Sequence, residues 1–105
     1  MIKVAILGYG TVGSGVFQII KENKELITNK AGQEIDIKYV LDLREFPGDP
    51  CENVLVHDYN IILNDPEVEV IIEVMGGLKP SYDFVKSALE AGKSVCTSNK
   101  DMVQN

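Results

Sequence analysis

Apolar segments alternate with amphipathic segments along this chain, and turns rich in glycine, proline or polar residues separate them. The first apolar segment, residues 2–7, has only Lys3 as a polar break, which is typical of a parallel strand covered on both faces. Residues 35–41 alternate apolar and polar side chains, which predicts a second strand with one face more exposed to solvent. Further strands are predicted at 54–56, 68–75 and 93–97.

Helical periodicity lies between these strands. From Thr11 onwards the apolar residues predict one amphipathic helix that reaches about Lys30 and ends at the Ala31-Gly32 pair. A short helix is expected near residues 59–63, and another, which Pro80 suits in its first turn, runs to Ala91-Gly92. The apolar stripe of the first helix is expected to consist of Val12, Val16, Ile19, Ile20, Leu26 and Ile27.

Alternating strands and helices are typical of an α/β fold. We predict a Rossmann-type doubly wound parallel sheet, in three α/β/α layers, with about five strands in the order 3-2-1-4-5. Residues 1–105 are treated as one domain, because no linker, repeat or low-complexity tract interrupts them. A sheet that stops after about five strands would leave an edge and an apolar face uncovered, which favours self-association.

Glycines follow the first strand with the spacing Gly-x-Gly-x-x-Gly. Gly8 allows a sharp turn, Gly10 leaves room for a pyrophosphate, and Gly13 lets the helix pack close to its strand. The free N–H groups of Thr11 and Val12 would face that phosphate, with the helix dipole favouring its charge. The strand, turn and helix around these glycines favour a dinucleotide site over a glycine turn without a ligand.

An acidic residue, Asp42, ends the second predicted strand. A carboxylate at this place usually accepts hydrogen bonds from the adenosine ribose, because it is an acceptor at the carboxyl edge of the sheet. The alternative is a solvated aspartate that opens a turn. Residues 43–53 contain Pro-Gly and Asp-Pro pairs and are expected to form a loop over the adenine end of the site.

Two more segments are expected at the same edge of the sheet. Gly76 and Gly77 follow the fourth strand, and bare backbone there would permit close approach of the nicotinamide ribose. The alternative is a flexible turn into the next helix. Residues 98–100 follow the fifth strand and form the third segment at this edge.

Composition excludes several classes of function. The formal charge of −6 would repel nucleic acid and anionic membranes, and no apolar stretch is long enough to cross a bilayer. The chain opens directly into a strand, so we expect no export signal and a cytoplasmic location. Cys51 and Cys96 are too few for a metal knuckle and are interpreted as reduced, with Cys96 in the core. His57 is interpreted as an ordinary loop residue, with a cofactor or catalytic contact as the alternative.

Three ordered motifs resemble the N-terminal cofactor domain of homoserine dehydrogenase. They are the glycine loop over 8–15, the Glu-Val-Met-Gly-Gly segment over 73–77 with Pro80, and Ala-Gly-Lys at 91–93 followed by Thr-Ser-Asn-Lys at 97–100. The resemblance covers essentially this whole chain but only the first part of a family protein. It implies an NAD(P)-dependent interconversion of L-homoserine and L-aspartate 4-semialdehyde, in the biosynthesis of threonine, methionine and isoleucine.

The resemblance also implies roles for the residues after the fifth strand. The family pattern Thr-Ala-Asn-Lys matches Thr97, Ser98, Asn99 and Lys100, with serine in place of alanine. It implies that Lys100 is catalytic and that the three residues before it contact the cofactor. An ammonium group there could hydrogen-bond the substrate oxygen on which charge changes during hydride transfer.

A substrate and dimerisation domain follows in family proteins and lies outside this chain. We therefore expect the chain to bind the cofactor without turning over homoserine, and the full-length protein to be a homodimer that acts on a small molecule. Two other functions stay open. One is a stand-alone nucleotide-binding or sensing module without catalysis, and the other is a related amino-acid or imine reductase.

NAD and NADP are both candidate cofactors, with NAD favoured. Many family members carry an arginine immediately before the acidic residue after the second strand, whereas this chain has Leu41. A 2′-phosphate would then face Asp42 without an adjacent guanidinium. Arg44 lies beyond the predicted strand end, and we expect it to be too far along the loop to cancel the repulsion.

Overall fold

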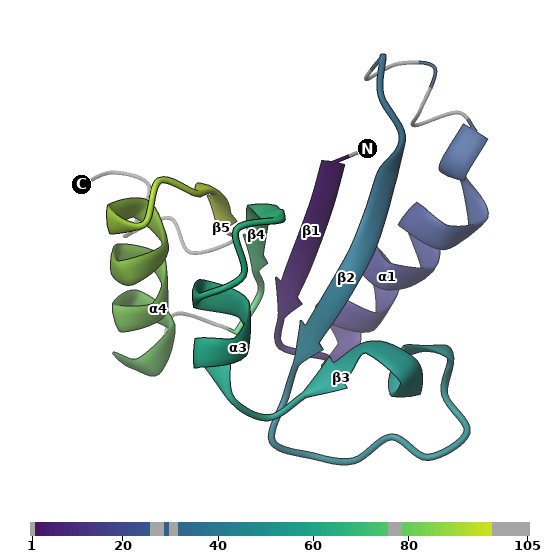
Figure 1. Cartoon of the computed structure of the whole chain (residues 1–105). Coiled ribbons are helices and arrows are strands. Elements are labelled where there is room, and N and C mark those ends of the chain that lie inside the picture. Colours follow the sequence, from purple (N-terminus) through teal and green to yellow (C-terminus); the bar gives the residue numbers. More distant parts are fainter. Residues whose placement is uncertain (1, 26–28, 30–31, 76–78, 98–105) are drawn as a thin grey trace.

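The computed structural model describes residues 2–25, 29, 32–75 and 79–97 of the chain. Within these residues the strands form one parallel sheet of five, in the order β3-β2-β1-β4-β5 (Figure 1). This confirms the predicted topology, and the order reverses between β1 and β4. The strands are β1 (Ile2–Leu7), β2 (Ile35–Leu41), β3 (Leu55–Val56), β4 (Val68–Glu73) and β5 (Ser94–Thr97).

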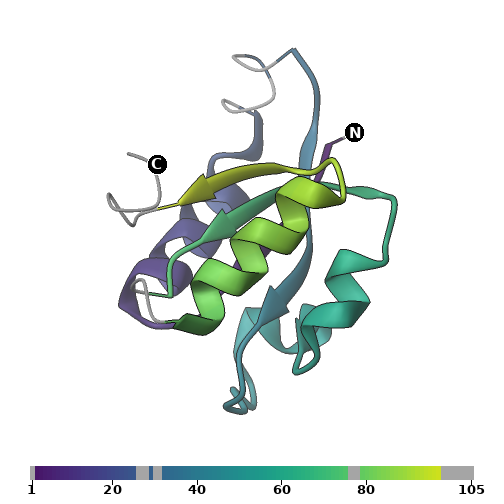
Figure 2. The ribbon, with the colours of Figure 1, turned by 90° about the vertical axis from the view of Figure 1, so that its left-hand side faces the viewer.

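Helices cover both faces of the sheet, which confirms the three-layer α/β/α architecture. Helix α1 (Thr11–Glu22) lies along one face, beside β1 and β2. The opposite face is covered by α3 (Tyr59–Leu63) and α4 (Lys79–Glu90), as Figures 1 and 2 show from two directions. A 3-10 turn, η1 (Pro50–Val54), lies within the loop that follows β2.

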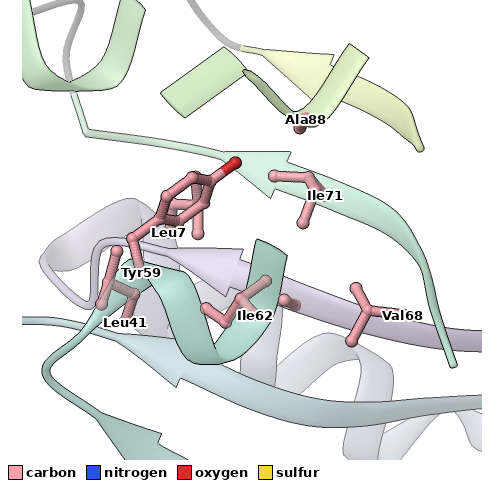
Figure 3. Packing of buried hydrophobic residues seen from close by; sticks show 8 residues of the cluster. Leu7, Leu41, Tyr59, Ile62, Val68, Ile71 and Ala88 are labelled. Carbon is pink, nitrogen blue, oxygen red and sulfur yellow. The ribbon is translucent and has the colours of Figure 1, made fainter. Parts of the chain in front are cut away.

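The central strand β1 supplies side chains to two separate cores. Ala5 and Leu7 pack with residues of α3 and α4, and Figure 3 shows Leu7 near Tyr59 and Ile62. Val4 and Ile6 pack on the other face, with Phe17 of α1. Every residue from Val4 to Leu7 is 3% exposed or less. Burial on both faces explains why Val4 to Leu7 are all apolar, because period-two alternation needs one solvated face.

The first helix is shorter than predicted. It ends at Glu22, with Asn23 as its C-cap, although Lys24 and Glu25 are helical again. Both the backbone N–H and the side-chain amide of Asn23 donate to the carbonyl of Ile19, at 3.0 and 3.1 Å. Asparagine competes for helical carbonyls in this way, so the expectation of one continuous helix to Lys30 is wrong.

The buried face of α1 also differs from the predicted stripe. Gly13 and Phe17 are buried, whereas Val12 and Ile19 are each 58% exposed. The buried stripe is rotated because Gly13 packs directly against the backbone of Gly8, just after β1. Val12, which precedes Gly13 in the helix, therefore faces outwards. Leu26 and Ile27 lie outside the described residues.

Three predicted strand bounds differ slightly from those in the structure. Val54 belongs to η1, the fourth strand ends at Glu73 and the fifth begins at Ser94. Cys96 is exposed, so its assignment to the core is wrong. Its neighbour Val95 packs towards the α4 side, so Cys96 points to the other face, where α1 covers β1 and β2 rather than this edge strand.

Candidate cofactor site

A cavity of about 580 Å³ lies at the carboxyl edge of the sheet, where the strand order reverses. Its walls come from the ends of β1, β2 and β4 together with the start of α3 and the middle of α4. This is the place where open parallel α/β sheets bind ligands. The lining residues are Gly8, Tyr9, Gly10, Leu41, Asp42, Leu43, Arg44, His57, Tyr59, Val74, Met75 and Phe84.

Two of the three motif glycines are required by the fold itself. Gly8 has φ +99°, a left-handed conformation that strains other residues, and its N–H donates to the carbonyl of Leu41 at 2.8 Å. A Cβ on Gly13 would lie 2.0 Å from the carbonyl oxygen of Gly8. The expectation that Gly13 permits close helix–strand packing is confirmed by this contact.

Gly10 is different, because neither its conformation nor its surroundings require glycine. Its φ of −80° and ψ of −155° are extended angles, and a Cβ there would meet no atom of the described residues within 4 Å. The space next to Gly10, which is a lining residue of the cavity, therefore holds no described atom. Its role beside a pyrophosphate stays a prediction.

The start of α1 is open to an anion. Gly10 is its N-cap and provides no side-chain hydrogen bond, and the first turn contains no acidic residue. Thr11 and Val12 are exposed, and within the described part of the chain their N–H groups have no hydrogen-bond acceptor. The positive end of the helix dipole is thus unneutralised at the edge of the cavity.

Asp42 is held by four hydrogen bonds. Its Oδ2 accepts from the N–H of Tyr9 at 2.9 Å and from Arg44 Nη2 at 2.9 Å, and its Oδ1 accepts from the N–H and Nε of Arg44 at 2.9 and 3.0 Å. The Arg44 guanidinium, followed by backbone N–H groups, holds the pKa of this carboxyl far below its ordinary range. A carboxylate offers about four acceptor positions, so those of Asp42 are occupied.

Arg44 therefore lies beside Asp42, and the expectation that it is too far along the loop is wrong. The backbone N–H of Arg44 bonds the carboxylate two residues earlier, which bends the chain back on itself. Its guanidinium then forms a bidentate pair with Asp42 and lies 5.2 Å from the ring centre of Phe46. The side chain stays 63% exposed and borders the cavity.

His57 also joins this corner of the cavity. Its Nδ1 lies 2.7 Å from the carbonyl oxygen of Asp42 and its Nε2 lies 3.0 Å from Glu45 Oε1. The carbonyl of Asp42, and then the charge of Glu45, raise the pKa of His57 above its ordinary value. Although His57 is far from the other candidates in sequence, β3 pairs with β2 and brings it beside Asp42 in the cavity lining, while its interpretation as an ordinary loop residue stays a prediction.

Tyr9 is a site residue that the sequence did not single out. Its hydroxyl donates to Asp49 at 2.6 Å, and its ring makes edge contacts with Phe17 and Phe46 at 5.8 and 4.9 Å between ring centres. These contacts fasten the loop after β2 to the glycine loop. An aromatic residue inside the glycine motif was the signal, but its partners lie too far away in sequence to be paired with it.

One predicted residue lies away from the cavity, and five more fall outside the described part of the chain. Thr97 ends β5, does not line the cavity, and its hydroxyl donates to Glu73 Oε2 at 2.5 Å. Glu73 itself is a buried residue that sequence reasoning overlooked. Gly76, Gly77, Ser98, Asn99 and Lys100 are outside the described residues.

Two absences concern the described part of the chain. No group of three or more histidine, cysteine or acidic side chains there is placed to hold a metal ion. None of the helices described is long and apolar enough to cross a bilayer.

The reversed strand order, the glycine turn, the open start of α1 and the carboxylate after β2 together define a Rossmann-type nucleotide-binding domain. A family model described as "Homoserine dehydrogenase, NAD binding domain" matches residues 8–104. The chain belongs to this family of homoserine dehydrogenase NAD-binding domains, and its cofactor class is a nicotinamide dinucleotide.

Individual relatives agree with this assignment. Homoserine dehydrogenase of Bacillus subtilis is 38% identical over 97% of this chain, and that of Lactococcus lactis is 33% identical over 97%. The crystal structure of S. aureus homoserine dehydrogenase at pH 7.0 superposes with a TM-score of 0.84 and 42% identity over 95% of this chain. The chain covers 24%, 25% and 26% of these proteins, respectively, so it spans about a quarter of their length.

Proposed function

We propose that this chain binds NAD(P) in the cavity between β1, β2 and β4, as the cofactor-binding part of a homoserine dehydrogenase. The observation that carries the proposal is the free space beside Gly10, next to the unneutralised start of α1. A pyrophosphate would lie there, with Thr11 and Val12 donating their N–H groups. In the whole enzyme the cofactor would accept a hydride from L-homoserine or return it to L-aspartate 4-semialdehyde.

The roles of individual residues, the pathway and the oligomeric state in this proposal rest on the resemblance to the family. Lys100 would hydrogen-bond the substrate oxygen, and Thr97, Ser98, Asn99, Gly76 and Gly77 would lie near the nicotinamide half. The enzyme would act in threonine and methionine biosynthesis, as a cytoplasmic homodimer. The substrate would contact residues of the part that this chain does not include.

Titration calorimetry with NAD and NADP tests the binding half of the proposal. We expect saturable binding of at least one dinucleotide and no oxidation of homoserine by the 105-residue chain, because the relatives are about four times as long. A folded chain that binds neither dinucleotide would contradict the assignment of the cavity.

Cofactor choice would depend on the Asp42–Arg44 pair. NAD would need Arg44 to release acceptor positions on Asp42 for the ribose hydroxyls, whereas the 2′-phosphate of NADP would need the guanidinium itself. We propose that the chain binds NAD more tightly than NADP, and that the difference in affinity is smaller than an unpaired Asp42 carboxylate would give. The pair lowers the local negative charge that would repel the phosphate.

Arg44→Ala is expected to raise the NAD-to-NADP affinity ratio about tenfold or more, because it frees Asp42 for the ribose and leaves its charge uncompensated against a 2′-phosphate. Arg44→Lys, which keeps the charge without the bidentate geometry, should fall between the two. Titration of both dinucleotides into each folded variant gives the ratio. An unchanged ratio in Arg44→Ala would show that Asp42 and Arg44 do not contact the adenosine ribose. Leu41→Arg is a poor test, because Leu41 is 5% exposed in the core.

A further inference from the structure

Glu73 is a fully buried acid at the carboxyl end of β4, with 0% of its surface exposed. Among the described residues the other buried charged side chain is Lys93, whose ammonium donates to the carbonyls of Asp65 and Val68 at 2.8 Å each. Lys93 lies before β5, at the amino end of β4, away from the cavity. Glu73 lies at the opposite edge of the sheet, where the cavity opens.

The carboxylate of Glu73 joins the ends of two strands. Its Oε1 accepts from the backbone N–H of Met75 at 2.7 Å, just after β4. Its Oε2 accepts from the hydroxyl of Thr97 at 2.5 Å, at the last position of β5, where the two residues are register partners. No ion pair involves Glu73 within the part of the chain that is described.

Met75 connects this carboxylate to the cavity. It is a lining residue, and its Cγ would lie 3.0 Å from a Cβ added to Gly8, so it packs closely against the glycine turn. Fixing the backbone of Met75 therefore fixes a wall of the cavity. In the sequence, Met75 directly precedes Gly76-Gly77, and Thr97 directly precedes the Ser98-Asn99-Lys100 segment.

Burying an acid away from water is costly, and hydrogen-bond partners for its oxygens offset that cost. An apolar side chain of similar size would avoid the cost but would take this acceptor away from the Met75 N–H and the Thr97 hydroxyl. What the carboxylate supplies is two acceptor atoms in fixed positions, which an apolar side chain lacks. Glu73 thus contributes the relative placement of two strand ends.

We propose that Glu73 is a positioning residue for the nicotinamide half of the cofactor site, acting through Met75 and Thr97. This inference rests on the proposed function. The two halves of a doubly wound sheet each hold one mononucleotide, and Asp42 after β2 marks the adenosine half. Glu73 lies on the other side of β1, so its hydrogen bonds shape the half that would hold the nicotinamide.

Glu73→Leu and Glu73→Gln, titrated with NAD and with ADP, separate this role from a purely structural one. We expect Glu73→Leu to stay folded, to bind ADP within about twofold of the native chain, and to bind NAD about tenfold more weakly. Glu73→Gln should recover most of the NAD affinity. Its amide oxygen can accept from the N–H of Met75, and its NH₂ group can donate to the hydroxyl of Thr97.

Native NAD affinity in folded Glu73→Leu would overturn the positioning role, as would an equal loss for ADP and NAD. If Glu73→Leu does not fold, Glu73→Met takes its place, since its flexible side chain fills similar space without a strong acceptor. A native chain that binds ADP but neither NAD nor NADP would contradict the proposed function and this role together. If the native chain binds NAD and folded Glu73→Leu binds it equally well, this role alone is contradicted and the proposed function stands.

Discussion

Gly13→Ala is expected to destabilise the domain by about 3 kcal/mol or more, a large part of the roughly 5 to 15 kcal/mol that holds a domain folded. The added Cβ would lie 2.0 Å from the carbonyl oxygen of Gly8 and 2.9 Å from its carbonyl carbon. Both are backbone atoms after the central strand, so relief requires α1 to move away from β1. Urea unfolding followed by circular dichroism measures the loss.

Gly15→Ala is the control for this substitution, because it lies two residues later in the same helix and its Cβ meets nothing within 4 Å. Alanine there should be neutral or stabilise the domain by up to about 1 kcal/mol, since glycine is a poor helix former. Equal unfolding midpoints for Gly13→Ala and the native chain would show that α1 does not pack against Gly8 as described.

Gly10→Val is expected to weaken dinucleotide binding at least about 100-fold while the domain stays folded. The extended backbone angles at Gly10 accept a side chain, and a Cβ there meets no described atom within 4 Å. The branched side chain would instead fill the space proposed for the pyrophosphate. Calorimetric titration with NAD and NADP gives the affinity, and thermal unfolding confirms that the variant is folded.

The two glycines thus separate stability from binding within one motif. Gly13→Ala should change the unfolding midpoint, whereas Gly10→Val should change the dissociation constant and leave the midpoint close to native. Native affinity in a folded Gly10→Val variant would place the phosphate elsewhere on the chain. A Gly10→Val variant that unfolds would instead mean that the loop has a structural need for glycine at this position.

The sequence pattern predicted the position of Asp42 but not its hydrogen bonds. Its place after the second strand followed from the alternation of residues 35–41, because a strand ends where that alternation ends. The occupation of all its acceptor positions did not follow. It depends on Arg44 bending back onto the carboxylate and on the N–H of Tyr9, which comes from the glycine loop after β1. Neither contact can be inferred from the spacing of residues near Asp42.

The sequence by itself determined the strands, their order and the glycine turn. Those features follow from backbone periodicity, from conformations that only glycine adopts without strain, and from the topology that alternating strands and helices allow. Tertiary structure alone decided which residues far apart in sequence form hydrogen bonds with each other. The pairing of β3 with β2 placed His57 beside Asp42, and the pairing of β4 with β5 placed Thr97 on Glu73. It also decided that Cys96 is exposed, because burial at a sheet edge depends on which helix covers which strands.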